Sequence, residues 1–273
     1  MATTGSLVRD LRVAPGKAAQ LDARDPGQRL GLGRKAEAHG LLEILSVRLD
    51  DLHSRLWAEA RRSVVLVLQG MDAAGKDGTI RRVLSGLNPQ GCEVVNFKEP
   101  TSVALVHDYL WRVHNACPAR GILGVMNRSH YEDLVTARMV GVIDDEQCKR
   151  RFRHVREFER MLTDEGTTLV KVFLHISKEE QRVRLQERID DPAKNWKFHR
   201  SDLEVRAKWD EYHERYEAAL SATSTQWAPW YVVPGDHRWV RDIAVASILV
   251  DVFERLDPRI PEPETGLEGV VVD

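Results

Sequence analysis

The chain has 273 residues, of which 42% are hydrophobic and 30% are charged, and its formal net charge is −2. A chain of this length can bury a full core, and it fits one large α/β domain with extensions better than two domains. The near balance of charge indicates that an anionic substrate would be attracted by a local basic patch, not by the whole molecule.

The cysteines and the N-terminus bear on the compartment. Cys92, Cys117 and Cys148 are scattered without CxxC spacing, so neither a disulfide framework nor a zinc cluster is indicated. No charged segment followed by an apolar one begins the chain, and no apolar stretch is long enough to span a bilayer. We expect a soluble cytoplasmic protein with free thiols, and neither a membrane nor nucleic acid as a partner.

The first sixty residues divide into two segments. Residues 1–33 are rich in glycine, alanine, proline and charge without a clear period, which predicts a flexible N-terminal arm. Over residues 34–62 apolar side chains recur at helical spacing, which predicts an amphipathic helix. That helix is expected to pack on the core or on a second subunit, and the second alternative favours a homo-oligomer.

A buried strand and a glycine-rich loop come next. Residues 63–69 are a continuous apolar, β-branched run, which predicts a strand buried on both faces of a parallel sheet. The following loop has the Walker A spacing of Gly70, Gly75 and Lys76, and residues 79–84 have helical periodicity. This order of elements aims backbone N–H groups at phosphate oxygens. The residues predicted to bind phosphate are Gly70, Ala73, Ala74, Gly75, Lys76, Asp77 and Gly78.

Two carboxylates distinguish this loop from the usual pattern. Asp77 stands where a serine or threonine hydroxyl would ligate magnesium, and Asp72 lies inside the loop. Two anions beside a phosphate cradle would repel the substrate unless a divalent cation lies between them. We therefore interpret the loop as a site for a polyphosphate and a metal ion, with a reassigned metal ligand.

The rest of the chain alternates strands with helices. Strands are predicted at residues 93–97, 121–126, 168–175 and 230–234, and helices within 107–114 and 144–162, from 177, and over 240–256. This alternation predicts a doubly wound parallel α/β sheet flanked by helices, in one domain over residues 34–273. Ligands of such sheets bind at the carboxyl ends of the strands. The segments that follow residues 69, 126 and 175 are therefore expected to converge on one site.

The polar cluster after the third strand supplies further candidates. Asn127 stands in the place of a Walker B carboxylate but carries no charge. Glu132 and Asp133, together with Asp72, can supply the negative charge that magnesium needs. Arg128 is placed to neutralise charge on a transferred phosphoryl group. The alternative is a turn held by local hydrogen bonds, with Arg128 in a structural salt bridge.

A charged segment over about residues 178–215 has two helical stretches separated by a proline-containing break at 190–198. Such a hairpin fits a lid that closes over phosphates and excludes water. Acidic residues are about as numerous there as basic ones, so a solvated helical hairpin is the alternative. The basic residues expected to track a phosphate chain are Arg184, Arg188, Lys194 and Lys197.

Three motifs in combination resemble the polyphosphate kinase 2 family. They are residues 69–78, the sequence Asn-Arg-Ser-His-Tyr-Glu-Asp at 127–133, and Trp196-Lys197-Phe198 with Asp202, Arg206, Trp209, Asp210 and Tyr212. The resemblance covers residues 34 to 256. It implies a P-loop kinase fold similar to thymidylate kinase, with a helical lid, and inorganic polyphosphate as the phosphoryl donor with Mg²⁺.

The resemblance also implies roles for individual residues. The sequence at 127–133 is similar to the subgroup that phosphorylates both AMP and ADP, whereas members restricted to nucleoside diphosphates typically begin it with aspartate and follow its tyrosine with Asn-Arg. Asp72 and Glu132 would handle metal or acceptor, and Lys76 and Arg128 the transferred phosphoryl group. On the nucleotide side the implied residues are Lys98, Asn127 and Asp133.

The predicted function is transfer of the terminal phosphoryl group of inorganic polyphosphate to AMP or ADP, or to nucleoside mono- and diphosphates in general. Its expected catalytic residues are Asp72, Lys76, Arg128 and Glu132, with the metal held by Asp72 and Glu132. An ATP-dependent nucleoside or nucleotide kinase is the alternative enzyme. A catalytically idle phosphate-binding module is the alternative from another class.

Overall fold

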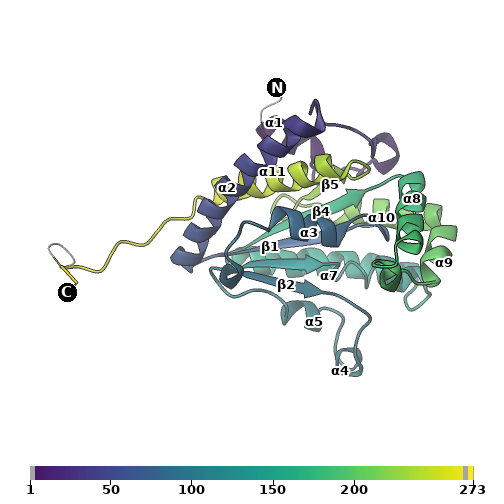
Figure 1. The fold of residues 1–273 in the computed structure, drawn as a ribbon. Coiled ribbons are helices and arrows are strands. Elements are labelled where there is room, and N and C mark those ends of the chain that lie inside the picture. Colours follow the sequence, from purple (N-terminus) through teal and green to yellow (C-terminus); the bar gives the residue numbers. More distant parts are fainter. Residues whose placement is uncertain (1–3, 267–269, 273) are drawn as a thin grey trace.

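The computed structural model describes residues 4–266 and 270–272, and it shows a central sheet with helices on both faces (Figure 1). Within these residues the sheet has five strands, all parallel, in the order β2-β3-β1-β4-β5. The strands are β1 (Ser63–Gln69), β2 (Cys92–Asn96), β3 (Leu123–Asn127), β4 (Thr167–His175) and β5 (Trp230–Pro234). The predicted doubly wound α/β sheet is confirmed.

Burial along the strands follows from their composition. Every residue of β1 and of β5 is buried, as their uninterrupted apolar runs predict, while the edge strand β2 is only half-buried or exposed. Leu68 pairs with Asn127 of β3, and Gln69 pairs with Phe173 of β4. Because this register aligns the carboxyl ends of β1, β3 and β4, the segments that follow these strands meet at one edge of the sheet.

The helices form two layers (Figure 1). On one face, α1 (Thr4–Leu11), α2 (Lys35–Glu59) and α3 (Lys76–Val83) pack with α11 (Arg238–Leu256). On the other face, α7 (Asp145–Asp164) packs on β4 and on α10 (Trp209–Thr223). The shorter elements are α4 (Ser102–Leu105), α5 (Trp111–His114), α6 (Val135–Met139), η1 (Leu21–Ala23) and η2 (Pro89–Gly91).

A helical hairpin stands beyond the carboxyl ends of the strands, at the right of Figure 1, where the lid is expected. It consists of α8 (Lys178–Asp190), η3 (Asn195–Lys197) and α9 (Ser201–Ala207). The helix expected within residues 107–114 is shorter in the structure. Only Trp111–His114 is helical there, because the Asp108 side chain accepts from the Leu110 N–H and makes a turn instead.

The N-terminal segment differs from the expected flexible arm. Residues 1–3 lie outside the described residues, but α1 buries Leu7, Val8 and Leu11 beside α11. The Val13 N–H then donates to Trp230 O at 2.8 Å, and the Glu217 carboxylate accepts from the backbone N–H groups of Gln20 and Leu21. Residues 4–33 therefore pack on the domain. The sequence did not predict this packing, because the short apolar repeat of α1 is surrounded by glycine, proline and charged residues.

The long helix α2 packs on the core of the domain, which was the first of its two expected packing modes. Leu45, Leu49, Leu52 and Leu56 are buried, and α2 packs along α11. Its leucines recur at three- and four-residue spacing, so that one face of the helix is apolar and packs against α11. This leaves Ile44 and other apolar residues of the opposite face exposed.

Candidate active site

The phosphate loop joins β1 to α3, and glycine is required at two of its positions. Gly70 and Gly75 have φ angles of 152° and 100°. A Cβ atom would lie 2.7 Å from Leu174 O at position 70 and 2.0 Å from Arg241 Nη1 at position 75. The resulting tight turn leads directly into the amino end of α3, the part of a helix that favours anions.

The Lys76 side chain folds back over this loop. Its Nζ donates to Gly70 O at 2.8 Å and lies 3.4 Å from Met71 O, and the residue is 9% exposed. Burial, and then the nearby Arg128 guanidinium, lower the pKa of the Lys76 ammonium to about 8. A phosphate anion in the loop would offset this desolvation and would give the ammonium stronger acceptors than two carbonyl groups.

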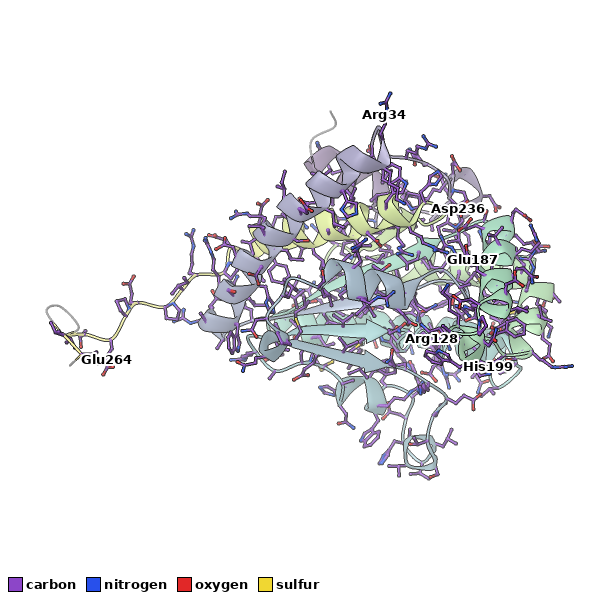
Figure 2. All side chains as sticks on the ribbon, in the orientation of Figure 1. Arg34, Arg128, Glu187, His199, Asp236 and Glu264 are labelled. Atoms are coloured by element: carbon purple, nitrogen blue, oxygen red, sulfur yellow. The ribbon has the colours of Figure 1, made fainter. Side chains whose placement is uncertain are left out.

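Arg128 and Asp72 meet across the loop. Arg128 Nη2 lies 2.9 Å from Asp72 Oδ1, and both side chains are partly exposed. Burial alone would lower the pKa of Arg128, but the nearby carboxylates of Glu132 and Asp72 raise this pKa overall. Arg128 has a φ of 62°, a left-handed conformation that is uncommon outside glycine and often found at functional sites. Figure 2 shows Arg128 on the side of the sheet that faces the α8–α9 hairpin. The structure therefore shows a salt bridge of Arg128, the feature expected in the structural alternative, and places it beside the phosphate loop.

Asp77 links three parts of the site. Its Oδ1 accepts from Asn127 Nδ2 at 2.8 Å, and its Oδ2 lies 3.3 Å from Lys197 Nζ at the tip of the hairpin. Burial would raise the pKa of Asp77, but the hydrogen bonds from Asn127 and Lys197 lower it overall. In this structure Asp77 therefore fastens the hairpin to α3 and to the end of β3.

Glu132 lies beside the loop with both of its carboxylate oxygens hydrogen-bonded. Thr136 Oγ1 donates to its Oε2 at 2.7 Å. With the Gln69 amide oriented so that its oxygen accepts from the Ser129 N–H, the Gln69 nitrogen donates to Glu132 Oε1 at 3.0 Å. Both of these donors, the Thr136 hydroxyl and the Gln69 amide, are neutral. Asp72 and Glu132 each act electrostatically on Lys76 and on Arg128, which places both carboxylates around the same cations.

Asp133 faces away from this cluster. Its carboxylate accepts from Arg112 Nη2 at 2.7 Å, while Arg112 Nη1 donates to Lys98 O at 2.8 Å and the guanidinium lies over the Phe97 ring. The Lys98 side chain itself is exposed. Arg112 therefore holds the segment after β2 against the end of the 127–133 motif. Sequence reasoning missed Arg112, because no local pattern marks a pairing across 21 positions.

Arg184 differs from its expected role as a contact for the phosphate chain. It is 5% exposed, and all five of its N–H groups donate within the protein. The acceptors are Glu180 Oε1, the loop carbonyls of Ala73 and Ala74, and the carbonyls of Gly235 and Asp236. Arg184 therefore joins the back of the phosphate loop to the segment after β5 and has no donor left for substrate.

The other basic residues of the hairpin divide between its interior and its surface. Arg188 Nη1 lies 3.6 Å from Asp202 and 3.3 Å from Lys197 O, inside the hairpin. Lys194 pairs with Asp191 on the surface. Gln181 is fully buried and donates to Asp72 O at 3.0 Å. Together with the buried Arg184, these contacts show that the hairpin packs on the phosphate loop and is not a freely solvated pair of helices.

Two residues of the 127–133 motif lie in the core instead of the site. Tyr131 Oη donates to Glu159 Oε1 at 2.8 Å, and His130 Nε2 lies 3.3 Å from the same oxygen. Lys171 Nζ donates to Glu159 Oε2 at 2.6 Å, and neither partner of this ion pair is exposed. Burial lowers the pKa of Lys171, and the nearby ammonium lowers that of Glu159 against the effect of burial. The network anchors the motif from below and was not predicted.

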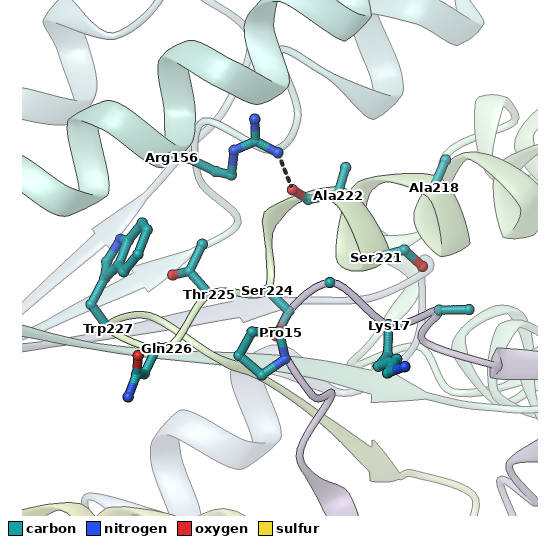
Figure 3. Close-up of a pocket in the computed structure, with 12 residues that line it drawn as sticks. Pro15, Lys17, Arg156, Ala218, Ser221, Ala222, Ser224, Thr225, Gln226 and Trp227 are labelled. Atoms are coloured by element: carbon teal, nitrogen blue, oxygen red, sulfur yellow. Dashed lines mark hydrogen bonds between the residues drawn. The ribbon is translucent and has the colours of Figure 1, made fainter.

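A cavity with a volume of about 690 Å³ lies elsewhere (Figure 3). It is an open depression between the N-terminal segment near Lys17 and the loop that leads into β5 near Trp227. Arg156 on its rim donates to Ala222 O at 2.9 Å, as the dashed line in Figure 3 shows. No carboxylate lines it and the phosphate loop does not reach it, so it is separate from the candidate site.

The donor set at the phosphate loop fits magnesium completed by substrate. Among residues 4–266 and 270–272, no three histidine, cysteine or acidic side chains are grouped as for a protein-only metal site. Mg²⁺ commonly takes one or two carboxylates and fills its remaining positions with water and substrate phosphates. Asp72 and Glu132 meet that requirement.

In the part of the chain that the structure describes, no helix has the length and apolarity needed to cross a bilayer.

The chain was compared with known proteins. The family model described as "Polyphosphate kinase 2" matches residues 34–260. The chain is 49% identical over 267 residues to the AMP/ADP-polyphosphate phosphotransferase of Meiothermus ruber, covering 97% of this chain and 100% of that protein. It is 44% identical to the ADP-polyphosphate phosphotransferase of Rhodopseudomonas palustris over 84% of this chain and 83% of that one.

The solved structures agree with the sequence comparison. The crystal structure of polyphosphate kinase 2 from Arthrobacter aurescens superposes with a TM-score of 0.93 at 40% identity, covering 98% of this chain and 96% of that chain. The fold that was expected from the three sequence motifs, a P-loop kinase fold, is therefore confirmed. With the family model, the close relatives and the superposed structure in agreement, the chain belongs to the polyphosphate kinase 2 family.

Proposed function

We propose that this protein transfers the terminal phosphoryl group of inorganic polyphosphate to AMP and to ADP. The observation that carries the proposal is the meeting of Lys76 and Arg128 with the carboxylates of Asp72 and Glu132 at the carboxyl edge of the sheet. The names of the similar proteins from Meiothermus ruber and Rhodopseudomonas palustris support the two acceptors.

The proposed step is an in-line displacement. A terminal phosphate oxygen of AMP or ADP attacks the end phosphorus of polyphosphate, and the bond from that phosphorus to its bridging oxygen breaks. The bridging oxygen leaves with its electron pair on a chain one unit shorter. The attacking oxygen is already anionic near neutral pH, so no strong general base is needed. Catalysis in such reactions rests on positioning and on neutralising the charge of a loose transition state.

The residues of the site divide this work. Lys76 and the loop N–H groups hold the transferred phosphoryl group, and Arg128 neutralises its equatorial oxygens after partly releasing Asp72. Mg²⁺ held by Asp72 and Glu132 would neutralise charge between donor and acceptor phosphates. Asp77 is assigned to fastening the hairpin, since both of its oxygens are engaged by Asn127 and Lys197.

The acceptor is proposed to bind at the segment after β2. Lys98 has an exposed ammonium there, and the Arg112–Asp133 pair fixes the backbone that carries it. Asp133 thus supports nucleotide binding indirectly. Asn127, which faces the phosphate loop, lies between the acceptor and donor sides.

The hairpin is proposed to act as a lid over the donor. Lys197 reaches the loop through Asp77, and Lys194 and Arg188 lie along the same hairpin. Opening the Lys197–Asp77 contact would free an ammonium and admit the donor. Closing it again would exclude water from the phosphoryl group.

Separate observations support our proposals for location and assembly. Cys92, Cys117 and Cys148 are free thiols, and burial raises the pKa of Cys92 and Cys117 to about 11. Free, unreactive thiols suit a reducing compartment, so we place the protein in the cytoplasm.

Exposed Ile44 and Val47 on the outer face of α2 support the proposal of a homo-oligomer. Val47→Glu should then lower the mass measured by light scattering.

A donor and acceptor panel tests the function. AMP, ADP, GMP and GDP are each incubated with Mg²⁺ and either polyphosphate or ATP, and products are separated by chromatography. We expect AMP and ADP to be phosphorylated from polyphosphate. Robust transfer from ATP to AMP with none from polyphosphate would establish the ATP-dependent kinase instead. Inactivity with every donor would support an idle phosphate-binding module.

A further inference from the structure

The helix α10 carries two tyrosines that have no role in the phosphoryl transfer as proposed above. Tyr212 and Tyr216 are four positions apart, so their side chains lie on the same face of the helix. They are 7% and 5% exposed. Among residues 4–266 and 270–272, neither hydroxyl has a hydrogen-bond partner. A buried hydroxyl of this kind needs a partner from outside the protein.

Packing places the Tyr216 ring at the carboxyl edge of the sheet. Its ring centroid lies 4.9 Å from that of Phe173, and Phe173 pairs with Gln69, the last residue of β1 before the phosphate loop. Farther along α10, Thr223 Oγ1 accepts from Tyr131 Oη at 3.0 Å, which ties the end of this helix to the 127–133 motif. Tyr216 therefore lies beside the ends of β1 and β4, where the residues of the candidate site meet.

The charged groups that act on Tyr216 are those of the site. Burial, and then the Glu132 carboxylate, raise the pKa of the Tyr216 phenol well above its usual value, while Arg128 acts in the opposite sense. Asp72 adds to the effect of Glu132, and the same three residues act on the Lys76 ammonium. Tyr216 and Lys76 thus border one cluster, from α10 on one face of the sheet and from α3 on the other.

The Tyr216 hydroxyl is also open to a ligand. Tyr109 Oη is sealed inside the protein without a partner, whereas Tyr216 Oη is not sealed in this way. A phenol that keeps its proton offers one O–H donor, and an anionic oxygen is the acceptor that binds such a donor most strongly. The phosphate groups of the two substrates supply anionic oxygens at this edge of the sheet.

We propose that the Tyr216 hydroxyl donates a hydrogen bond to an oxygen of the transferred phosphoryl group, which makes Tyr216 a further catalytic residue. The inference rests on the proposed function, because it concerns the same transfer. Packing on Phe173 holds the ring in place before the substrates bind, so the hydroxyl needs no reorganisation when charge shifts in the transition state. Lys76 and Arg128 supply positive charge to that group, and Tyr216 adds a neutral donor from the side of α10.

The test is Tyr216→Phe, which removes one oxygen and keeps the ring packing. With AMP and polyphosphate, kcat should fall about 10- to 100-fold, as for the loss of one hydrogen bond to a charged group. The KM for AMP and the KM for polyphosphate should each stay within about twofold of the wild type, since the bond acts mainly in the transition state. The midpoint of urea denaturation should not change, because the hydroxyl has no partner within the protein to lose.

Tyr231→Phe in β5 is the matched control. Tyr231 is 2% exposed, but the charged groups around it are Arg12, Asp251 and Arg255, so its kcat should equal that of the wild type. An unchanged kcat in Tyr216→Phe, a raised KM for AMP with unchanged kcat, or a lower kcat accompanied by a lower urea midpoint would each overturn the assignment. Failure of the proposed function would look different, because the wild type itself would then show no turnover with polyphosphate, and both proposals would fall.

Discussion

Lys76 shows how burial and charge tune a single side chain in this site. Its ammonium lies on two loop carbonyls with a pKa of about 8, beside the cation of Arg128 and the carboxylates of Asp72 and Glu132. With this pKa, the lysine loses its charge at a lower pH than an ordinary lysine does. It regains that charge when phosphate provides anionic acceptors.

Replacing Lys76 with alanine should abolish most turnover without unfolding the protein. Loss of one preorganised cation at the transferred group is expected to lower kcat by about 10² to 10³, because its effect is greatest in the transition state. ADP formation from AMP and polyphosphate measures the loss, and circular dichroism checks the fold. The same change at Lys149, an exposed lysine of α7, serves as the control. Retention of most activity in Lys76→Ala would contradict the assigned role.

The pH profile should report the pKa of Lys76. In the free enzyme the ammonium is half deprotonated near pH 8, so kcat/KM for polyphosphate should fall as the pH rises above about 8. Bound phosphate raises this pKa again, so kcat should remain level to a higher pH than kcat/KM. A kcat/KM that stays flat to pH 9.5 or beyond would mean that Lys76 keeps its proton before the donor binds, against the value of about 8.

At the scale of elements, one hub joins the hairpin, the phosphate loop and the segment after β5. Arg184 on α8 donates to backbone carbonyls of the other two parts, and Gln181 on the same helix holds the carbonyl of Asp72. The base of the hairpin is therefore held against the phosphate loop. Its tip reaches the loop separately, through Lys197 and Asp77.

Arg184→Gln should destabilise the protein and misplace the loop. Removing the guanidinium leaves buried carbonyl groups and Glu180 without partners, at a cost of about 3 kcal/mol in the free energy of unfolding. Chemical denaturation measures this cost. Arg182→Gln on the same helix is a matched control, because that arginine pairs only with Glu179 in an exposed position and should change stability by less than about 0.5 kcal/mol. Equal stability of the two variants would refute the hub.

Lys197→Gln should loosen the closed hairpin. The change removes the contact with Asp77, so we expect a higher KM for polyphosphate and an unchanged free energy of unfolding, since the pair is partly exposed. Hydrogen exchange of the hairpin amides gives an independent readout, with faster exchange over residues 190–200. Unaltered exchange together with an unaltered KM would show that this contact does not hold the lid.

Sequence patterns predicted the elements well where burial is continuous or periodic. The strand predicted at 63–69 and the helix predicted at 144–162 agree with β1 and with α7 (Asp145–Asp164), because their apolar patterns are local. The pairing of Arg112 with Asp133 and the buried Lys171–Glu159 pair were missed, because they join distant positions. The contacts of Arg184 could not be predicted either, since the side chain of a basic residue on a helix can bind substrate or backbone carbonyls equally well.

The whole molecule includes its N-terminal segment in the folded domain. Buried leucine and valine side chains of α1 lie beside α11, and the segment continues to β5 through the Val13–Trp230 hydrogen bond. Beneath this layer the loop, the 127–133 motif and the hairpin share one edge of the sheet. These three segments therefore surround the residues of the proposed active site.

Leu11→Ala should lower the free energy of unfolding by about 3 kcal/mol, as for other buried leucines replaced by alanine. Leu11 is 3% exposed. Urea denaturation measures the effect, with Val271→Ala as the control because that side chain is 83% exposed. If Leu11→Ala were as stable as the wild type, the N-terminal segment would be the loose arm that its composition suggests.

The Mg²⁺ dependence of the Asp72→Asn variant tests the central claim most directly. Turnover of AMP with polyphosphate is measured across Mg²⁺ concentrations for the wild type, for Asp72→Asn and for Asp145→Asn, a control at an exposed carboxylate on α7. Loss of a carboxylate that anchors the cation should raise the Mg²⁺ concentration for half-maximal rate about 10- to 100-fold, with no change for the control. An Asp72→Asn enzyme with wild-type turnover and wild-type Mg²⁺ dependence would contradict the account.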